Sequence, residues 1–203
     1  PRIHPSFEFP AFTMEIGMLG TMNILEWARN KECKVIYAGS SSVHSGHYSN
    51  PYPFSKVMGD ELCMAYKQMF GVDTKICRFY NVYGPHQLTE GEYCTVIGVF
   101  EKQYKEGVDL TITGDGFQRR DFTHIDDIVE GLILTSESKE FDLDIVELGR
   151  GHNHSINELA EMFGCEYTYI PKRPGEAEVT LCDTSVAKKD IGYNPKVNLE
   201  DYV

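Results

Sequence analysis

Lys34-Val-Ile-Tyr-Ala-Gly-Ser-Ser-Ser42 joins a short apolar run to a glycine and three serines. An apolar run of this length, followed at once by small polar residues, is typical of a strand buried in a parallel sheet. Helical spacing of apolar residues precedes it at 13–30 and follows it at 52–70, where Asn50 can cap the first turn. A buried strand between two helices predicts a layered α/β fold.

The alternation of strand and helix continues to the end of the chain. Apolar runs predict further strands at residues 75–79, 110–113, 144–148 and 167–170. Helices, the last two capped by Ser155 and Asp183, are expected at residues 93–106, 125–136, 155–163 and 183–192. Regular alternation of this kind predicts a parallel sheet with helices on its faces.

The composition and the net charge indicate which class of protein this is and which partners it can bind. With 41% hydrophobic and 25% charged residues, the chain has the composition of a soluble globular protein. No apolar run approaches the ~18 residues that cross a bilayer, so no membrane partner is expected. The net charge of −12 opposes binding to nucleic acid, although converging arginines would still suit a small anion. The six cysteines lie far apart without paired metal spacing, which predicts reduced thiols in the cytoplasm and no metal site.

Tyr52 and Lys56 stand four residues apart, so on a helix they share one face. A tyrosine acts as a base only as its phenolate, and its ordinary pKa is about 10. Work near neutral pH requires a pKa lower by about three units, or roughly 4 kcal/mol. A neighbouring ammonium and a helix N-terminus both shift the pKa in that direction. The spacing therefore favours an acid–base pair.

The serines at residues 40–42 give this pair a context. A serine hydroxyl at the strand end is suited to bridge a substrate oxygen and the phenolate. Taken alone, a Tyr-x-x-x-Lys spacing is most often structural, and a serine run most often caps a helix or forms a turn. The two features together, one just ahead of the other in the chain, point to catalysis.

The order of these segments resembles the extended short-chain dehydrogenases of the nucleotide-sugar epimerase/dehydratase family. The resemblance covers almost the whole chain. It is carried by a series of motifs, each weak alone and specific in this order: Val35-Ile-Tyr-Ala-Gly-Ser-Ser-Ser-Val43, Pro51-Tyr-Pro-Phe-Ser-Lys56, Arg78-Phe-Tyr-Asn-Val-Tyr-Gly-Pro85, Gly114-Asp-Gly-Phe-Gln-Arg-Arg-Asp-Phe122, His124-Ile-Asp-Asp127, Glu147-Leu-Gly149, Ser155-Ile-Asn-Glu-Leu159 and Arg173-Pro-Gly-Glu176.

The resemblance implies a role for each residue that matches a family motif. The catalytic residues would be Ser40, Tyr52 and Lys56, with Ser40 favoured as the proton relay over the two serines that follow it. NAD would be held by Tyr52, Lys56 and Phe79. The substrate, a nucleotide-diphosphate sugar, would be bound by five further residues: Ser41, Ser42, Asn81, Arg120 and Arg173. The two arginines would grip the diphosphate, because a guanidinium binds phosphate through two parallel hydrogen bonds.

The residues after Ser40 favour one reaction of the family. The 4,6-dehydratases carry an acidic pair where this chain has Ser41 and Ser42. An epimerase needs no such acid, since a hydride leaves C4 and returns to it. The resemblance thus implies NAD-dependent 4-epimerisation, with a dehydratase or decarboxylase as the alternative. His44, which replaces the family's usual tyrosine, leaves the identity of the sugar open.

The glycine-rich turn with which the family begins has no counterpart near the start of this chain. The chain is therefore predicted to be a truncated form that retains the C-terminal part of a Rossmann-like doubly wound sheet and a small α/β substrate-binding region. A non-catalytic fragment that binds a nucleotide sugar or a subunit is the alternative from another class.

The resemblance also implies how the chain is divided and how it assembles. Residues 1–90 would be the remainder of the NAD-binding domain, and 91–203 mainly the substrate-binding part, with a segment around 110–150 returning to the sheet. The helices at 13–30 and 52–70 would pair with their symmetry mates in a homodimer. The second of them is apolar on more than one face, which suits a helix covered on two sides.

Overall fold

A parallel three-stranded sheet forms the centre of the computed structural model, which describes residues 3–138 and 144–203. Its strands lie in the order β1 (Val35–Ser40), β2 (Thr74–Phe79) and β7 (Ile145–Leu148). All three run parallel, with β2 in the middle. Their carboxyl ends therefore meet at one edge of the sheet, which is where ligands bind in open α/β folds.

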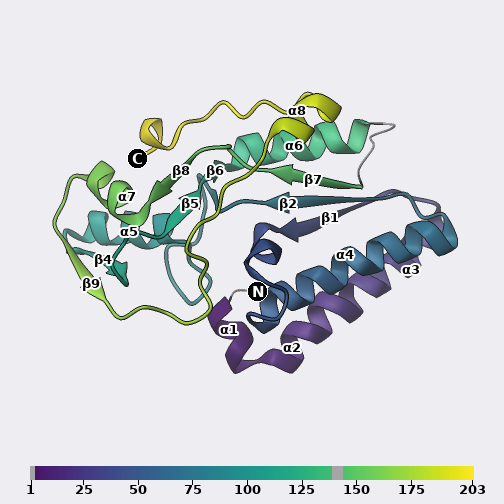
Figure 1. The fold of residues 1–203 in the computed structure, drawn as a ribbon, viewed down its shortest axis with the longest axis horizontal. Helices are drawn as coiled ribbons and strands as arrows, with labels where there is room; N and C mark the ends of the chain where they lie inside the picture. The colour runs from purple at the N-terminus through teal and green to yellow at the C-terminus, as the bar shows by residue number, and fades with distance from the viewer. Residues whose placement is uncertain (1–2, 139–143) are drawn as a thin grey trace.

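Helices cover both faces of this sheet (Figure 1). On one face lie α3 (Thr21–Lys31) and α4 (Pro51–Phe70), and on the other α6 (Ile125–Glu137) and α8 (Ser185–Ile191). The predicted α/β class with a parallel sheet is confirmed. Within the described residues, no helix has both the length and the apolar character needed to traverse a bilayer.

The helix predicted at 13–30 is longer and less regular than expected. It follows α1 (Ile3–Glu8) and runs as α2 (Pro10–Met14), a π-helical segment (Glu15–Gly20) and α3. Thr21, the first residue of α3, donates a hydrogen bond from its hydroxyl to the carbonyl of Gly17 in the π-helical segment (2.7 Å). Hydrogen bonds of this type from Thr to the preceding turn accompany local distortion of a helix.

A second region lies beyond the carboxyl edge of the sheet (Figure 1). There β4 (Leu110–Thr113) pairs in parallel with β9 (Tyr167–Ile170). The flanking helices are α5 (Val96–Glu106) and α7 (Ile156–Phe163). Their apolar side chains, with Phe100 fully buried among them, form the largest hydrophobic cluster. Of the segment 110–150, β7 therefore returns to the main sheet, whereas β4 does not.

Two pairs of short strands link the two regions, and the sequence analysis did not predict them. They are β3 (Val82–Tyr83) paired with β6 (Thr123–His124), and β5 (Arg119–Asp121) paired with β8 (Asn153–Ser155). Each has only two or three residues, too few for an alternating pattern to be recognised.

Two helix starts differ in detail from the sequence pattern. The helix expected from Tyr93 begins only after Thr95, whose side chain accepts a hydrogen bond from a first-turn amide. At α8 the expected cap, Asp183, accepts a hydrogen bond from the Ser185 amide (2.9 Å) although the helix boundary lies between them. The predicted capping box at the start of α7 is present in full.

Helix α4 presses closely on β1 at Gly59. A Cβ added there would lie 2.0 Å from the hydroxyl oxygen of Tyr37. We therefore expect Gly59→Ala to lower the free energy of unfolding by about 1–3 kcal/mol, the usual cost of overpacking. Gly20→Ala is the matched control, since its Cβ would meet nothing within 4 Å. Urea titrations that show equal stability for the two variants would contradict the close contact.

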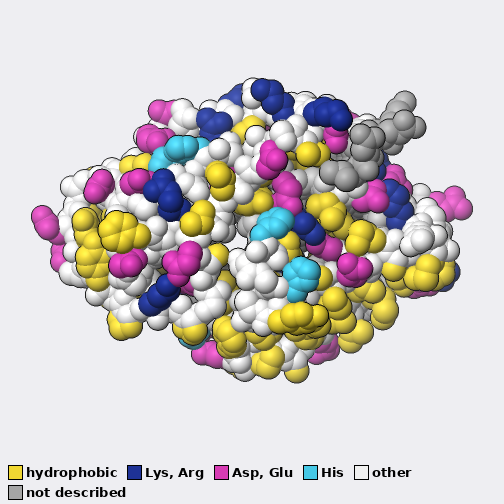
Figure 2. All heavy atoms as spheres, in the orientation of Figure 1, with side chains coloured by type: hydrophobic (Ala, Val, Ile, Leu, Met, Phe, Trp, Pro, Cys, Tyr) yellow, Lys and Arg dark blue, Asp and Glu magenta, His cyan; other side chains and the backbone are white. Residues whose placement is uncertain are grey.

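Hydrophobic side chains are exposed along the N-terminal helices (Figure 2, lower edge). We call this surface the N-terminal apolar face, and it comprises Phe9, Phe12, Ile16, Leu19, Ile24 and Trp27. An exposed apolar patch on a folded chain marks a surface that another element or chain covers.

Candidate active site

A cavity of about 450 Å³ opens at the carboxyl edge of the main sheet. It is lined by every site residue predicted from the sequence except Lys56: Ser40, Ser41, Ser42, Tyr52, Phe79, Asn81, Arg120 and Arg173. These side chains come from β1 and the short 3₁₀ helix after it, from α4, from β2 and the residues that follow it, from β5 and from the loop after β9. Residues separated by more than a hundred positions thus meet in one space.

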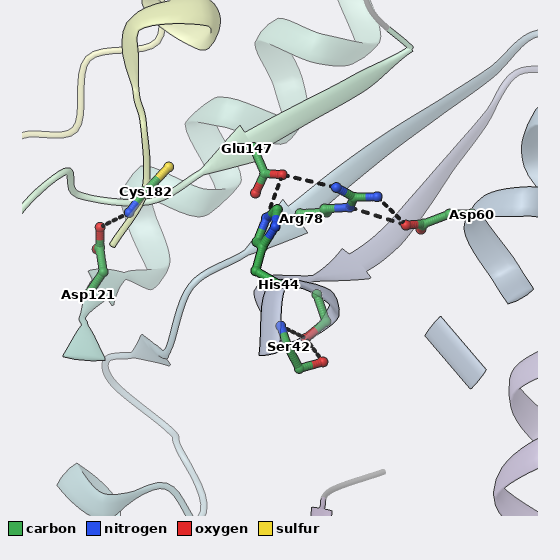
Figure 3. Close-up of polar contacts among 8 residues, drawn as sticks. Ser42, His44, Asp60, Arg78, Asp121, Glu147 and Cys182 are labelled. Carbon is green, nitrogen blue, oxygen red and sulfur yellow. Dashed lines mark hydrogen bonds and ion pairs between the residues drawn. The ribbon is translucent and has the colours of Figure 1, made fainter. Parts of the chain in front are cut away.

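The three serines form a hydrogen-bonded turn at the end of β1. The hydroxyl of Ser40 accepts a hydrogen bond from the backbone amide of Ser42 (3.2 Å) and donates to its hydroxyl (2.9 Å) (Figure 3). Ser40 thereby caps the short 3₁₀ helix Ser41–Ser45. The interpretation of the serine run as a helix cap is confirmed, and the capped serines line the cavity.

Tyr52 lies in the first turn of α4 and lines the cavity. The side chain of Asn50 accepts a hydrogen bond from the Tyr52 amide (3.1 Å), as expected of an N-cap. Pro51 occupies the first helical position, where its missing N–H costs nothing. The positive end of the helix dipole therefore lies beside this tyrosine.

Lys56 lies one turn further along α4 and does not line the cavity. Its ammonium donates to the carbonyl of Ala38 on β1 (2.8 Å) and lies 5.1 Å from the centre of the Tyr37 ring. Burial lowers the pKa of Lys56, and Asp60 opposes that shift. An ammonium has three donors, so a group anchored at Ala38 still has donors to offer a cofactor.

Arg120 and Arg173 line the cavity from different elements. Arg120 is largely buried, donates to the carbonyl of Arg119 (3.0 Å) and lies 3.8 Å from Glu176. Burial lowers its pKa, with Glu176 and Glu178 acting against the shift. Arg173 is exposed in the loop after β9. Two guanidiniums on one cavity wall suit an anion with two phosphate groups.

A second cavity of about 230 Å³ adjoins the first. Asn81, Cys94, Arg120 and Arg173 line both, so the arginines stand where the two spaces meet. The side chains found only in the second cavity come mainly from α5, β4, α7 and β9 and include Val99, Phe100, Thr111, Thr113, Ile156 and Ile170. A ligand gripped by the arginines would therefore extend in two directions.

Asn81 lines the cavity, but its existing hydrogen bonds restrict how its side chain can bind a substrate. Its side-chain nitrogen donates to the carbonyl of Asp121 (3.0 Å) and to the hydroxyl of Thr180 (3.1 Å). An amide nitrogen has two hydrogens, and both are engaged. Its oxygen can accept a hydrogen bond from a sugar hydroxyl, but a diphosphate has no hydrogen to donate to it.

A network of charged side chains contacts the serine turn through His44 and was not predicted from the sequence. Arg78 lies between Asp60 (2.7 Å) and Glu147 (3.2 Å), and His44 contacts Glu147 (3.0 Å) (Figure 3). Burial acts to raise the pKa of Glu147, but His44 and Arg78 outweigh it and hold the pKa below the ordinary value. The signal in the sequence was Arg78, a charged residue beside the apolar Cys77 and Phe79 at the end of a strand.

The buried carboxylate of Asp121 binds backbone amides of two neighbouring loops. Its carboxylate accepts hydrogen bonds from the amides of Arg150 (2.8 Å), Gly151 (2.9 Å) and Cys182 (3.0 Å), the last drawn in Figure 3. Burial raises the pKa of Asp121, and these amides offset part of the rise. The carboxylate thus ties β5, which carries Arg120, to the end of β7 and to the segment before α8.

Comparison with known proteins agrees with this geometry. A model of the NAD dependent epimerase/dehydratase family matches residues 2–149. A protein of Methanocaldococcus jannaschii, named provisionally as a UDP-glucose 4-epimerase, is 30% identical over 98% of this chain and 70% of its own length. A UDP-glucuronate 4-epimerase of Thermodesulfobacterium geofontis is also 30% identical, over 98% of this chain and 66% of its own.

Solved structures share the fold of this chain. The UDP-glucuronic acid 4-epimerase of Bacillus cereus, solved with UDP-glucuronic acid and NAD, is 30% identical with a TM-score of 0.81 over 92% of this chain and 64% of its own. The UDP-glucose 4-epimerase of Thermotoga maritima, at 24% identity, shares the fold with a TM-score of 0.92 over 98% of this chain and 71% of its own.

The chain spans about two thirds of the length of these relatives. The part it shares with them contains the serine turn, the Tyr52–Lys56 helix and both arginines. The family inferred from the sequence is confirmed, with NAD as the cofactor of the family. On its sequence, its fold and the residues brought together in its cavity, this chain belongs to the NAD dependent epimerase/dehydratase family of enzymes.

Proposed function

We propose that the complete protein is an NAD-dependent 4-epimerase of a UDP-sugar. One observation carries the proposal: Ser40, Tyr52 and the two arginines Arg120 and Arg173 line a single cavity at the carboxyl edge of the sheet. The acid–base groups and the diphosphate-binding groups are thereby within one substrate's reach. The names of the relatives, which include 4-epimerases of UDP-glucose and UDP-glucuronate, support the same reaction and nucleotide.

The residues present fit the nicotinamide end of NAD. Lys56 has donors for ribose hydroxyls beside Ala38, and Phe79 offers an apolar side chain where β2 meets the cavity. Tyr52 lies between these two and the sugar. Held by these residues, NAD would supply reversible hydride transfer at C4 of the sugar.

The chain's own groups move the proton and hold the sugar. The Tyr52 phenolate takes the proton of the C4 hydroxyl, with the Ser40 hydroxyl as a bridge, while the hydride leaves C4. When the hydride returns, Tyr52 gives that proton back, so no net oxidation occurs. Lys56 stabilises the phenolate by its charge. Ser41 and Ser42 contact the sugar, in the place where a dehydratase would need carboxylates.

The two adjoining cavities support one orientation of the substrate. The diphosphate lies at their junction, between Arg120 and Arg173. The nucleoside then occupies the smaller cavity beside α5 and β4, and the sugar extends toward the serine turn. We further propose residues 1–90 as part of the NAD-binding domain and 91–203 as mainly the substrate-binding part.

The proposal is tested by incubating the complete protein with NAD and either UDP-glucose or UDP-galactose. Conversion of each sugar into the other, followed by nuclear magnetic resonance, is the expected result. Retention of configuration in both would refute the proposal. A stable 4-keto product would replace it with a dehydratase, and loss of carbon dioxide from UDP-glucuronate would replace it with a decarboxylase.

A homodimer through helices 13–30 and 52–70 and a cytoplasmic location complete the proposal. The N-terminal apolar face supports the dimer, because its side chains lie on the first of these helices and next to it. No disulfide joins any of the six cysteines within the described residues, which supports a reducing compartment.

Trp27→Glu tests the dimer. The side chain is 57% exposed on the N-terminal apolar face, and a charge there would have to be buried in the interface. Light scattering should give about twice 23.1 kDa for the natural chain and one chain's mass for this variant. Tyr104→Glu, equally exposed on α5, should leave the dimer intact. A natural chain that is monomeric at high concentration would rule out the interface.

A further inference from the structure

Thr180 lines the larger cavity, and the sequence analysis gave it no role. The segment that carries it is held against β5 by backbone hydrogen bonds. The amide of Thr180 donates to the carbonyl of Arg119 (3.0 Å), and the Arg119 amide donates to the carbonyl of Glu178 (2.8 Å). The Thr180 carbonyl accepts a further hydrogen bond from the side chain of Asn153 (3.1 Å). The backbone on both sides of the Thr180 side chain is therefore fixed.

The hydroxyl of Thr180 contacts the side chain of Asn81 and the backbone of Asp121. It accepts a hydrogen bond from the side-chain nitrogen of Asn81 (3.1 Å) and another from the Asp121 amide (3.2 Å). The same Asn81 nitrogen donates its second hydrogen to the Asp121 carbonyl (3.0 Å). The NH₂ group of Asn81 is thus held between two acceptors, and one of them is the Thr180 hydroxyl.

The carbonyl of Asp121 determines which way the Asn81 amide faces. A carbonyl oxygen only accepts hydrogen bonds, so the amide atom beside it is the nitrogen and not the oxygen. With both N–H bonds directed at the protein, the atom that this amide offers a ligand is its oxygen, an acceptor. The backbone of Asn81 is unusual as well, because its φ is +24°, where Asn is found more often than most other residues.

We propose that Thr180 is a positioning residue, whose hydroxyl orients the Asn81 amide so that its oxygen accepts a hydrogen bond from a hydroxyl of the bound substrate. The inference rests on the proposed binding of a UDP-sugar in this cavity and adds a residue to it. The terminal torsion of an Asn side chain has a broad range. Without the Thr180 hydroxyl one N–H of Asn81 loses its acceptor, so the amide turns and its oxygen leaves the position that suits the substrate.

Calorimetry of UDP-glucose binding to the complete protein tests the proposal. Thr180→Val removes the hydroxyl and should lower the affinity by about three- to tenfold, the range of one neutral hydrogen bond. Thr180→Ala also lacks the hydroxyl and should show the same loss, so the test does not depend on one variant folding. Thr180→Ser keeps the hydroxyl and should stay within about twofold of the natural affinity. Thr168→Val, at an exposed position on β9 that does not line the cavity, is the matched control and should leave the affinity unchanged.

A double-mutant cycle distinguishes positioning from a direct contact or a general loss of structure. Asn81→Gly removes the amide, and glycine accepts the positive φ of this position. In that background Thr180→Val should lower the affinity by less than about twofold more, because the group that Thr180 orients is gone. An equal loss in both backgrounds would show that Thr180 acts without Asn81, and it would overturn the proposal.

Failure of this inference and failure of the proposed function give different results. Natural affinity in Thr180→Val, or the same loss in Thr180→Ser, would remove the role given to the Thr180 hydroxyl while the UDP-sugar site stands. If the natural protein does not bind UDP-glucose at all, the proposed site itself fails.

Discussion

Tyr52→Phe should lower the turnover number of the complete enzyme by about 10²–10⁴, the usual contribution of a positioned acid–base group. The substitution removes a single oxygen from a side chain that lines the cavity beside the serine turn. Substrate binding should change by no more than about threefold, because the arginines that grip the diphosphate are untouched. The measurement is a steady-state assay with UDP-glucose, paired with calorimetry of UDP binding.

Tyr48→Phe provides the matched control for this experiment. Tyr48 lies four residues earlier, is 89% exposed and does not line the cavity. Its variant should keep the natural turnover number. A Tyr52→Phe enzyme that retains more than about a tenth of the natural rate would show that another group moves the proton.

Asp121→Asn should lower the free energy of unfolding by about 2–4 kcal/mol. The carboxylate accepts hydrogen bonds from three backbone amides, those of Arg150, Gly151 and Cys182. An asparagine keeps one acceptor oxygen and turns an NH₂ group toward the remaining donors, so at least one buried amide loses its partner. Urea titration at neutral pH measures the loss.

The control for this variant is Asp126→Asn. The side chain of Asp126 is 80% exposed at the start of α6. Its replacement should change stability by no more than about 0.5 kcal/mol, as expected for a surface position. Equal stabilities of the two variants would mean that the loops around the cavity do not depend on Asp121.

The backbone elements that carry the site were readable from the sequence because their causes are local. The strand that ends at Ser40 is an apolar run, and the helix of Tyr52 has its own cap in Asn50. Motif order then assigned roles to both arginines, Arg120 and Arg173, which line the predicted site's cavity. The strand and the helix are each a pattern within about twenty residues, and motif order is read along the chain, so none of these features requires knowledge of the fold.

Other features have no local pattern. The ion pairs among Asp60, Arg78 and Glu147 join positions far apart in the chain, and the spacing of these residues does not predict them. The same holds for Asp121, whose partners lie 29 to 61 residues away. The sequence also did not indicate which strand of the segment around 110–150 returns to the main sheet: β7 does so, whereas the strand at 110–113 pairs with β9.

The sequence by itself determined the α/β class and the family, since these follow from periodicity, caps and motif order, and it predicted the acid–base pair. Only the tertiary structure decided which charges meet. It brought Arg78 between Asp60 and Glu147, and it brought Arg120 and Arg173 to the junction of two cavities. The physical reason is that charge acts through distance in space, and folding sets that distance independently of separation along the chain.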